Sequence, residues 1–452
     1  MNSSEKTTLI KTKQALLVLF LLVFVAPVFQ LALPFVNEKP LNGVDLAPPL
    51  PDFSPPTWIN EEYQKNYSLA FEQNIGFHNS LVRMYNQLNY TFFGFASGAV
   101  VVGEKDVLFL TSYIDAYTGG DFLGEEYIEI QTTKIKFLQD VLKKKNIDFF
   151  VIFAPGKGSF YSEYIPKRYT SGTKNGKTNY GEYKKMFSNS GVKFLDLCSI
   201  FLSKKQTEKH PLYSNTGVHW SEYGCFIAGK ELVSYIEKLR NIKLPKINVH
   251  SIKIASLSGN HSSDYDAASL MNIISTVPHP NYAIPKLEFV SDSTTIRPRF
   301  LCIADSYFSG IINTDIPSNV FTDYHYWLYN DGVYPETFLK TKHHDKKQLK
   351  KDLEKQDIVC LLATDASLTS FPFGFIDEAY EAYAAKDSNY YALKNKEFHR
   401  SVVTTIKRIN DNYTWKKQLI NNAKKKKISA IDEFIINAIW IYEQEQMKIK
   451  NG

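Results

Sequence analysis

The chain has 452 residues, which at typical domain sizes corresponds to roughly two or three folded units. Hydrophobic residues make up 44% and charged residues 22%, so the chain can bury a sizeable core and is not disordered as a whole. The net charge of +6 is a mild excess, part of it gathered in Lys424–Lys427, which argues against a dedicated nucleic-acid binder. Four cysteines without a CxxC pair argue against a zinc ribbon, a thioredoxin-type redox centre and a disulfide-dense scaffold.

The N-terminal region contains a long apolar stretch. Residues 15–36 carry no charge and follow Lys6, Lys11 and Lys13. About 20 apolar residues suffice to span a bilayer, whereas the apolar core of a signal peptide is shorter. Lysines on the N-terminal flank favour leaving that end in the cytoplasm. We predict a cytoplasmic tail over 1–14 and a single-pass transmembrane anchor over 15–36, with a cleaved signal peptide or a buried core helix as alternatives.

An anchor of this kind would place the rest of the chain outside the cytoplasm. In a cell with two membranes, the main domain would then be periplasmic and attached to the inner membrane. Residues 37–60 are rich in proline and predict an extended tether. Trp58 to Leu88 follows with a helical period of about 3.6 residues. We expect the main domain over 61–385, and a packed helical extension over 386–452 whose alternative role is a membrane-surface or partner helix.

Four apolar segments in the main domain are each followed by a turn. Strands that are apolar on both faces are typical of parallel sheets covered by helices. Helical patterns at about 124–145 and 221–239 can supply crossover connections. We therefore predict an α/β fold, a doubly wound parallel sheet with flanking helices. Its strands are expected at Ile147–Ala154, Val192–Leu197, Arg299–Ala304 and Asp357–Ala363.

Ser306 is the first candidate for chemistry. It lies two residues beyond the predicted strand Arg299–Ala304, where a helix can begin. Such a serine presents its hydroxyl at the carboxyl edge of the sheet, where open α/β folds place their sites. Neighbouring backbone N–H groups can stabilise an oxyanion there. The alternative role is a helix N-cap, which is common for serine at this position.

His219 is the second candidate and lies in a loop before the predicted helix 221–239. Histidine titrates near neutral pH and can act as general base on a serine hydroxyl. The alternative is a buried, hydrogen-bonded histidine beside Trp220. Lys157, in the turn after another strand, either binds an anionic sugar or is solvated.

Together with further segments, these residues resemble a known family. It is the SGNH-hydrolase-like proteins of the alginate O-acetyltransferase (AlgX/AlgJ) type, and the resemblance spans roughly residues 38–385. The segments that carry it are Leu46–Pro48, Tyr63–Tyr90, Val101–Gly103, Leu108–Phe109, Ala154–Lys157, Tyr164–Pro166, Val218–Ser221, Asp305–Tyr307, Tyr329–Asn330 and Phe371–Phe375.

The resemblance implies a nucleophile and a base. In the family, a serine after Gly-Asp is the nucleophile, and an Asp-x-His-Trp loop supplies acid and base. These roles fall on Ser306 and His219 here. The glycine is replaced by Ala304, and the motif aspartate is replaced by Gly217. The carboxylate that usually orients the imidazole is therefore missing from the motif, and its loss generally costs orders of magnitude in rate.

Three outcomes follow from the missing motif acid. The dyad can work with a backbone carbonyl or water on the second ring nitrogen, another acid can substitute, or the site is inactive. Candidate substitutes are Asp196, Asp264 and Asp266, whereas Asp305, although part of the motif, is expected to be structural.

The implied function is a membrane-anchored extracytoplasmic O-acetyltransferase that acts on an exopolysaccharide or cell-surface glycan through a serine acetyl-enzyme. A membrane-bound O-acyltransferase is the expected donor partner. Lys157, Trp220 and Tyr329 are expected to contact substrate, and no metal, cofactor or nucleic acid is expected. A carbohydrate acetyl-esterase and a non-catalytic glycan-binding or assembly subunit are the alternatives.

Overall fold

The computed structural model describes residues 3–44, 49, 51–171, 176–255, 263–335, 343–384 and 388–451. At its centre is a six-stranded sheet with the order β4-β3-β10-β7-β8-β9. From β4 to β8, every neighbouring pair is parallel. The strands are β3 (Asp148–Ala154), β4 (Phe194–Asp196), β7 (Arg299–Ala304), β8 (Asp323–Leu328), β9 (Gly332–Tyr334) and β10 (Ile358–Thr364).

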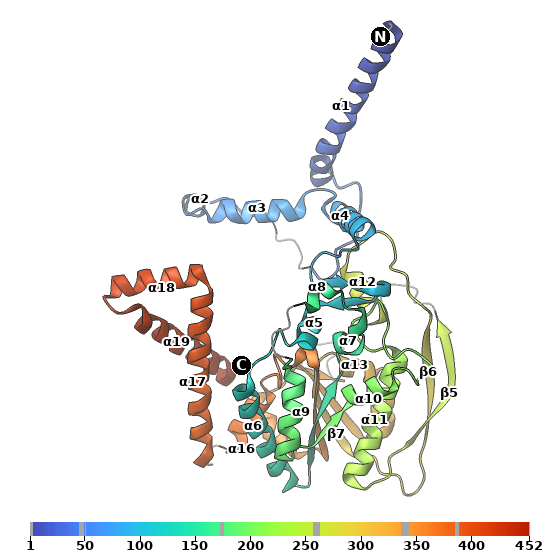
Figure 1. Ribbon diagram of the computed structural model, residues 1–452, viewed down its shortest axis with the longest axis vertical. Helices are drawn as coiled ribbons and strands as arrows, with labels where there is room; N and C mark the ends of the chain where they lie inside the picture. Colours follow the sequence, from blue (N-terminus) through green and yellow to red (C-terminus); the bar gives the residue numbers. More distant parts are fainter. Residues whose placement is uncertain are drawn as a thin grey trace.

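The two faces of the sheet pack into two separate cores. Alternate residues of β3, such as Phe150 and Phe149, enter opposite cores, and all residues of β3 and β10 are buried. One face is covered by α6 (Glu125–Lys143), α9 (Asn179–Ser190), α15 (Leu349–Glu354) and α16 (Phe375–Ala384). The other is covered by α11 (Glu222–Arg240) and α13 (Tyr307–Ile312) (Figure 1), together with α14 (Ile316–Val320). The predicted doubly wound α/β fold and its four strands are confirmed.

The sheet is not parallel throughout, which corrects the prediction at one edge. β9 pairs antiparallel with β8 because the chain reverses at Tyr329 and Asn330, both of which have positive φ angles of 51° and 59°. The sequence of β8, Asp-Tyr-His-Tyr-Trp-Leu, is interrupted by the polar residues Asp323 and His325. It therefore lacks the continuous apolar signal by which the other strands were predicted.

Two antiparallel pairs lie outside the central sheet. β1 (Val100–Val102) pairs with β2 (Leu108–Leu110), and β5 (Lys246–Ala255) pairs with β6 (Tyr282–Val290). The segment between β5 and β6 contains the short helix α12 (Asp266–Leu270), whose Ala268 N–H donates to the Thr216 carbonyl. The β5–β6 ribbon thus brings α12 back to the carboxyl edge of the main sheet. The remaining short helices are α5 (Thr111–Thr118), α7 (Lys157–Phe160), α8 (Lys167–Thr170) and α10 (Leu197–Lys204).

The N-terminal helix α1 (Ser3–Ala32) projects away from the body (Figure 1). Residues Ile10–Ala32 are long and apolar enough to cross a membrane, and 6% of the most apolar window is buried against the protein. Compared with the predicted span of 15–36, the helix begins earlier and ends before Pro34. Within the described residues it is the one helix with this length and composition.

The region predicted as a tether followed by one helix is divided into three helices. They are α2 (Pro55–Ile59), α3 (Glu62–Asn74) and α4 (His78–Phe93). α2 lies within the predicted tether, where Ser54 caps a helix that begins with two prolines. The predicted helical character of Trp58 to Leu88 is therefore confirmed, but Phe77, with a left-handed φ of 62°, separates α3 from α4, so the range is not one helix.

The C-terminal region forms a helical group beside α6. It consists of α17 (Ser388–Asp411), α18 (Tyr413–Lys426) and α19 (Ala430–Asn451) (Figure 1). Lys134 on α6 is buried and pairs with Asp377 on α16 at 2.6 Å and with Glu397 on α17. Arg400 on α17 donates to the Leu123 carbonyl at 2.9 Å. These polar contacts attach the extension to the main domain.

We expect Lys134→Met to loosen this attachment. The substitution removes the buried ammonium from Asp377 and Glu397 and leaves Lys394, 3.9 Å from Glu397, as the remaining cation beside them. Breaking a buried pair in this way typically costs about 3–5 kcal/mol. Chemical denaturation should report the lower free energy of unfolding, and limited proteolysis should cut α17 faster. Lys136→Met on the same helix is the control, because its partly exposed pair with Asp140 contributes about 0–1 kcal/mol. Equal effects of the two substitutions would contradict the prediction.

Candidate active site

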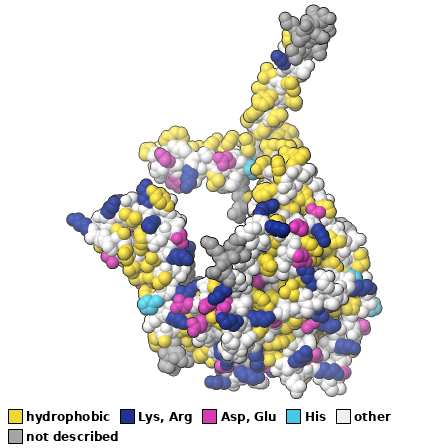
Figure 2. All heavy atoms as spheres, in the orientation of Figure 1, with side chains coloured by type: hydrophobic (Ala, Val, Ile, Leu, Met, Phe, Trp, Pro, Cys, Tyr) yellow, Lys and Arg dark blue, Asp and Glu magenta, His cyan; other side chains and the backbone are white. Residues whose placement is uncertain are grey.

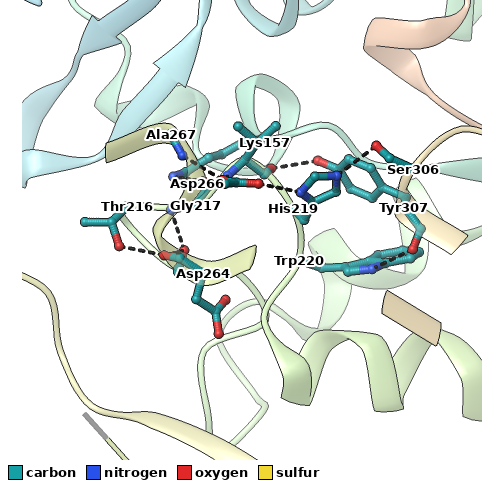
Figure 3. Close-up of polar contacts among 12 residues, drawn as sticks. Lys157, Thr216, Gly217, His219, Trp220, Asp264, Asp266, Ala267, Ser306 and Tyr307 are labelled. Carbon is teal, nitrogen blue, oxygen red and sulfur yellow. Dashed lines mark hydrogen bonds and ion pairs between the residues drawn. The ribbon is translucent and has the colours of Figure 1, made fainter. Parts of the chain in front are cut away.

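Ser306 lies at the carboxyl edge of the sheet, between β7 and α13. Its backbone is helical, with φ −62° and ψ −15°, and its hydroxyl makes no capping bond to α13. Instead, the Oγ atom lies 2.8 Å from Nε2 of His219 (Figure 3). The serine hydroxyl therefore interacts with the histidine and does not cap the helix.

The turn that holds Ser306 is fixed by its buried neighbour Asp305. One carboxylate oxygen accepts hydrogen bonds from the Thr364 N–H at 2.8 Å and from the Thr364 hydroxyl at 2.9 Å. The other accepts from the Tyr307 N–H at 3.1 Å. Asp305 thus ties the end of β7 to the end of β10, and its side chain does not contact the reacting hydroxyl. Burial raises the pKa of this carboxyl above its ordinary value.

His219 connects Ser306 to a carboxylate. Its Nδ1 atom lies 2.7 Å from Oδ2 of Asp266 at the start of α12. The other carboxylate oxygen of Asp266 accepts from the backbone N–H groups of Val218 at 2.5 Å and Ala267 at 2.7 Å. Two backbone donors fix the carboxylate, and the carboxylate in turn orients the imidazole through Nδ1. Nε2 then faces the serine. Ser306, His219 and Asp266 form one continuous hydrogen-bonded chain (Figure 3).

The other two candidate acids are placed differently. Asp264 is buried and its carboxylate points away from His219 (Figure 3), while its backbone carbonyl accepts from the Thr216 hydroxyl at 2.7 Å. Burial raises the pKa of Asp264 to about 7. Asp196 lies at the end of β4, where it caps α10 and pairs with Lys184. Of the three acids, only Asp266 contacts the imidazole.

Tyr307 and Trp220 hold the loop that contains His219 against α13. The Tyr307 hydroxyl donates to the Val218 carbonyl at 2.8 Å, and the Trp220 indole donates to the Tyr307 carbonyl at 3.2 Å. The Tyr307 ring also lies 4.9 Å from the His219 ring, measured between centroids. Tyr307 was missed at the level of sequence, because only its place directly after Ser306 could have indicated a role.

Of the predicted substrate-contacting residues, two are buried. Trp220 has no exposed surface, so it packs beneath the site and cannot stack on a sugar. Lys157 is 1% exposed, and its ammonium donates to the carbonyls of Asn215 at 2.8 Å and Gly217 at 2.6 Å. This corrects the expectation of a solvated or sugar-binding lysine, because the turn after β3 directs the side chain beneath the loop that contains Gly217 and His219. Tyr329 is 47% exposed at the end of β8 and remains a candidate for substrate contact.

The burial of Lys157 predicts a pH-dependent stability. Burial lowers its pKa to about 7, whereas the unfolded chain has the ordinary value near 10.5. Between these values the unfolded state binds more protons, so the folded state gains stability as pH rises. From pH 7 to 9, the wild type should gain about 2 kcal/mol relative to Lys157→Met, in which this group is absent. Denaturation of both proteins across this range measures the difference, and a constant difference would contradict the prediction.

The site is partly exposed to solvent, and it contains a backbone donor that can stabilise negative charge. The side chains of His219 and Asp266 are 23% and 32% exposed. The Ser306 N–H at the start of α13 has no acceptor in the part of the chain that the structure describes. It can therefore donate to an oxyanion that forms on a substrate carbonyl at Oγ. Within the same residues, no group of three or more His, Cys, Asp or Glu side chains is placed to hold a metal ion.

A serine, a histidine and a carboxylate at the carboxyl edge of a parallel sheet define a hydrolase-like site for acyl groups on an α/β fold. Residues 100–282 match the family described as "SGNH hydrolase-like domain, acetyltransferase AlgX". The match confirms the resemblance for this part of the chain. It includes His219 and Asp266, while Ser306 lies beyond its end.

Solved structures with similar folds include the O-acetyltransferase domain of Pseudomonas putida AlgJ, which is 14% identical, with a TM-score of 0.42 over 63% of this chain and 99% of that chain. Pseudomonas aeruginosa AlgX is 17% identical, with a TM-score of 0.40 over 62% of this chain and 66% of that chain. Bacillus cereus PatB1 with a sulfonyl adduct is 15% identical, with a TM-score of 0.38 over 56% of this chain and 93% of that chain. No curated protein sequence matches the chain.

Proposed function

We propose that the protein is a membrane-anchored, extracytoplasmic O-acetyltransferase that acetylates hydroxyl groups of an exopolysaccharide or cell-surface glycan. The observation that carries this proposal is the hydrogen-bonded chain of Ser306, His219 and Asp266, of which His219 and Asp266 lie in the part of the chain that matches an acetyltransferase family. An open site at the edge of the sheet suits a polymer, because a long acceptor can approach without being enclosed.

In the first half-reaction, Ser306 Oγ attacks the acetyl carbonyl of the donor while His219 Nε2 accepts the hydroxyl proton. The Asp266 carboxylate stabilises the imidazolium, and the Ser306 N–H donates to the carbonyl oxygen as it becomes negative. When the tetrahedral intermediate collapses, the donor's leaving group departs with the proton from His219. An acetyl ester on Ser306 and a neutral histidine remain.

In the second half-reaction, a sugar hydroxyl takes the place of the leaving group. His219 Nε2 removes its proton as the oxygen attacks the acetyl carbonyl, and the proton then returns to Ser306 Oγ. The acetyl group is now an ester of the sugar, and the enzyme is restored. If water took the place of the sugar, the protein would be an acetyl-esterase. This is the nearest alternative, because His219 is partly exposed to solvent.

The proposed membrane anchor is α1, whose apolar side chains between Leu16 and Phe24 are exposed. An anchored domain outside the cytoplasm needs an acetyl donor that reaches it through the membrane. We therefore propose a membrane-bound O-acyltransferase as the donor partner. The main domain, over 61–385, and the helical extension, over 386–452, remain our proposed division of the chain.

The contact of Asp266 with His219 argues against the alternative of a non-catalytic glycan-binding subunit. That alternative rested on Gly217, which stands where the family motif has an orienting aspartate. The contact between Asp266 and His219 Nδ1 at 2.7 Å supplies a carboxylate to the same ring nitrogen from another segment. An inactive scaffold would have no need of this contact, so its presence favours a working site.

The proposal is tested by incubating the full chain in detergent micelles with an activated acetyl ester and measuring intact mass. We expect one acetyl adduct, which peptide mapping places on Ser306, and which is removed faster by added glycan oligosaccharide than by water. Removal by water alone would favour an esterase. Folded protein that shows neither adduct nor turnover would contradict an acetyl-enzyme and leave glycan binding as the function to measure.

A further inference from the structure

The helix α4 exposes an apolar face to solvent. Each side chain that forms it is three or four residues from another member, so they lie along one face of the helix. Each is between 45% and 71% exposed. We call this face the α4 stripe; its members are Leu81, Met84, Tyr85, Leu88 and Phe92.

The opposite, polar face of α4 is directed at the protein. Asn86 is buried and donates to the Met271 carbonyl at 3.0 Å. The Gln87 side-chain oxygen accepts from the backbone of the segment that follows Met271, and Arg83 donates to the Pro40 carbonyl at 2.7 Å. A surface helix normally buries its apolar face and exposes its polar face. α4 is held in the reverse orientation, so the α4 stripe is presented outward by contacts that fix it.

The position of α4 next to α1 indicates what the α4 stripe meets. Gly76, between α3 and α4, packs so closely on the end of α1 that a side chain there would collide with the Pro27 carbonyl and with Gln30. Beyond the end of α1, the ring of Phe35 contacts the ring of Phe77, with centroids 5.7 Å apart. α4 therefore begins where the apolar helix ends (Figure 1), and hydrophobic side chains continue from α1 over this region (Figure 2).

A second feature at the same level is a row of aromatic rings along α2 and α3. Trp58 lies 5.8 Å from Tyr63, which lies 5.7 Å from Tyr67, which lies 6.1 Å from Phe71, all between ring centroids. Trp58 and Tyr67 are 50% and 40% exposed. Tryptophan and tyrosine are enriched where a membrane meets water, because their rings are apolar and carry one polar group.

We propose that the α4 stripe and this aromatic row rest on the outer interface of the bilayer that α1 crosses. The inference rests on the proposed membrane anchor. An amphipathic helix of this kind lies in the membrane plane, with its apolar face about 5–10 Å into the headgroup region. A second contact beside α1 would stop the main domain from rotating freely about a single tether. It would hold the active site at a fixed height above the membrane, where a membrane-bound donor releases acetyl groups.

The test uses the full chain in lipid vesicles with an environment-sensitive fluorophore on a single introduced cysteine. Suitable variants are Leu88→Cys on the α4 stripe, Leu22→Cys on α1 and Leu202→Cys on α10, where Leu202 is 47% exposed on the main domain. The four native cysteines are buried and do not compete for the label in folded protein. Emission is measured with nitroxide-bearing lipids as membrane quenchers and with iodide as aqueous quencher.

We expect the Leu88 label to shift to the blue and to lose emission to nitroxides near the headgroups, while iodide has little effect on it. The Leu202 label should be quenched by iodide and should be little affected by nitroxides. The Leu22 label should be quenched by nitroxides deep in the acyl region. Iodide quenching at Leu88 equal to that at Leu202, with Leu22 still quenched by lipid, would overturn the interface contact while leaving the anchor intact.

Two further outcomes would also overturn the inference. Loss of lipid quenching at both Leu22 and Leu88 would overturn the anchor and the interface contact together. A Leu88 label shielded from iodide but unaffected by lipid nitroxides would indicate that a protein surface, such as a second copy of this chain, covers the α4 stripe. Acetyl-adduct formation on the same samples reports the proposed function separately, since a soluble ester reaches Ser306 with or without the bilayer contact.

Discussion

Ser306→Ala is expected to abolish the acetyl adduct and to lower the rate of acetyl transfer by about a million-fold, the scale seen when a serine nucleophile is removed. The physical reason is that no other hydroxyl contacts His219 Nε2 among the residues described. Intact mass after incubation with an activated acetyl ester measures the adduct, and product release measures the rate.

The same substitution should barely change stability. An alanine that replaces a capping serine typically costs about 0.5–2 kcal/mol, but the Ser306 hydroxyl caps nothing. Thermal unfolding should therefore give nearly the same midpoint for Ser306→Ala and wild type. Ser309→Ala, one turn further along α13, is the matched control and should retain the adduct. An adduct that persists in Ser306→Ala would place the nucleophile elsewhere.

Asp266→Asn is expected to lower the rate of adduct formation by about 10³–10⁴-fold with the fold intact. The N–H groups of Val218 and Ala267 both donate to Oδ1, so the amide oxygen of asparagine will stay with them. Its NH₂ group then faces His219 Nδ1, which must accept. The proton moves to Nε2, and the imidazole can no longer take the proton of Ser306.

Nitrogen chemical shifts of His219 measure this change directly, because they distinguish the two tautomers. Asp264→Asn is the matched control, two residues away in the same segment. Its carboxyl is buried, its pKa is raised to about 7, and it does not contact His219 in the structure, so an amide should be tolerated there. Equal losses from the two substitutions would show that the segment, rather than the contact to His219, determines activity.

The central sheet could be predicted because its strands carry their signal locally. Each residue of β3 and β10 is buried, and continuous apolar segments of that kind are uncommon outside a covered parallel sheet. The last two strands on one side of the sheet, β8 and β9, gave no such signal, since they are only partly buried and their pairing with each other depends on the turn at Tyr329 and Asn330. The break at Phe77 was missed for a related reason, because phenylalanine, unlike asparagine or aspartate, does not indicate a left-handed backbone.

The sequence by itself determined the α/β class, the apolar N-terminal helix, and Ser306 and His219 as the residues to examine. Their types and their places after strands are local properties of the chain. Only the tertiary structure decided which acid meets the histidine, because Asp266 reaches it through the β5–β6 ribbon, 47 residues further along the chain. It also decided that Lys157 and Trp220 lie beneath the site and that the apolar face of α4 points outward. Those outcomes depend on which surfaces the packed domain covers, and spacing along the chain does not carry that information.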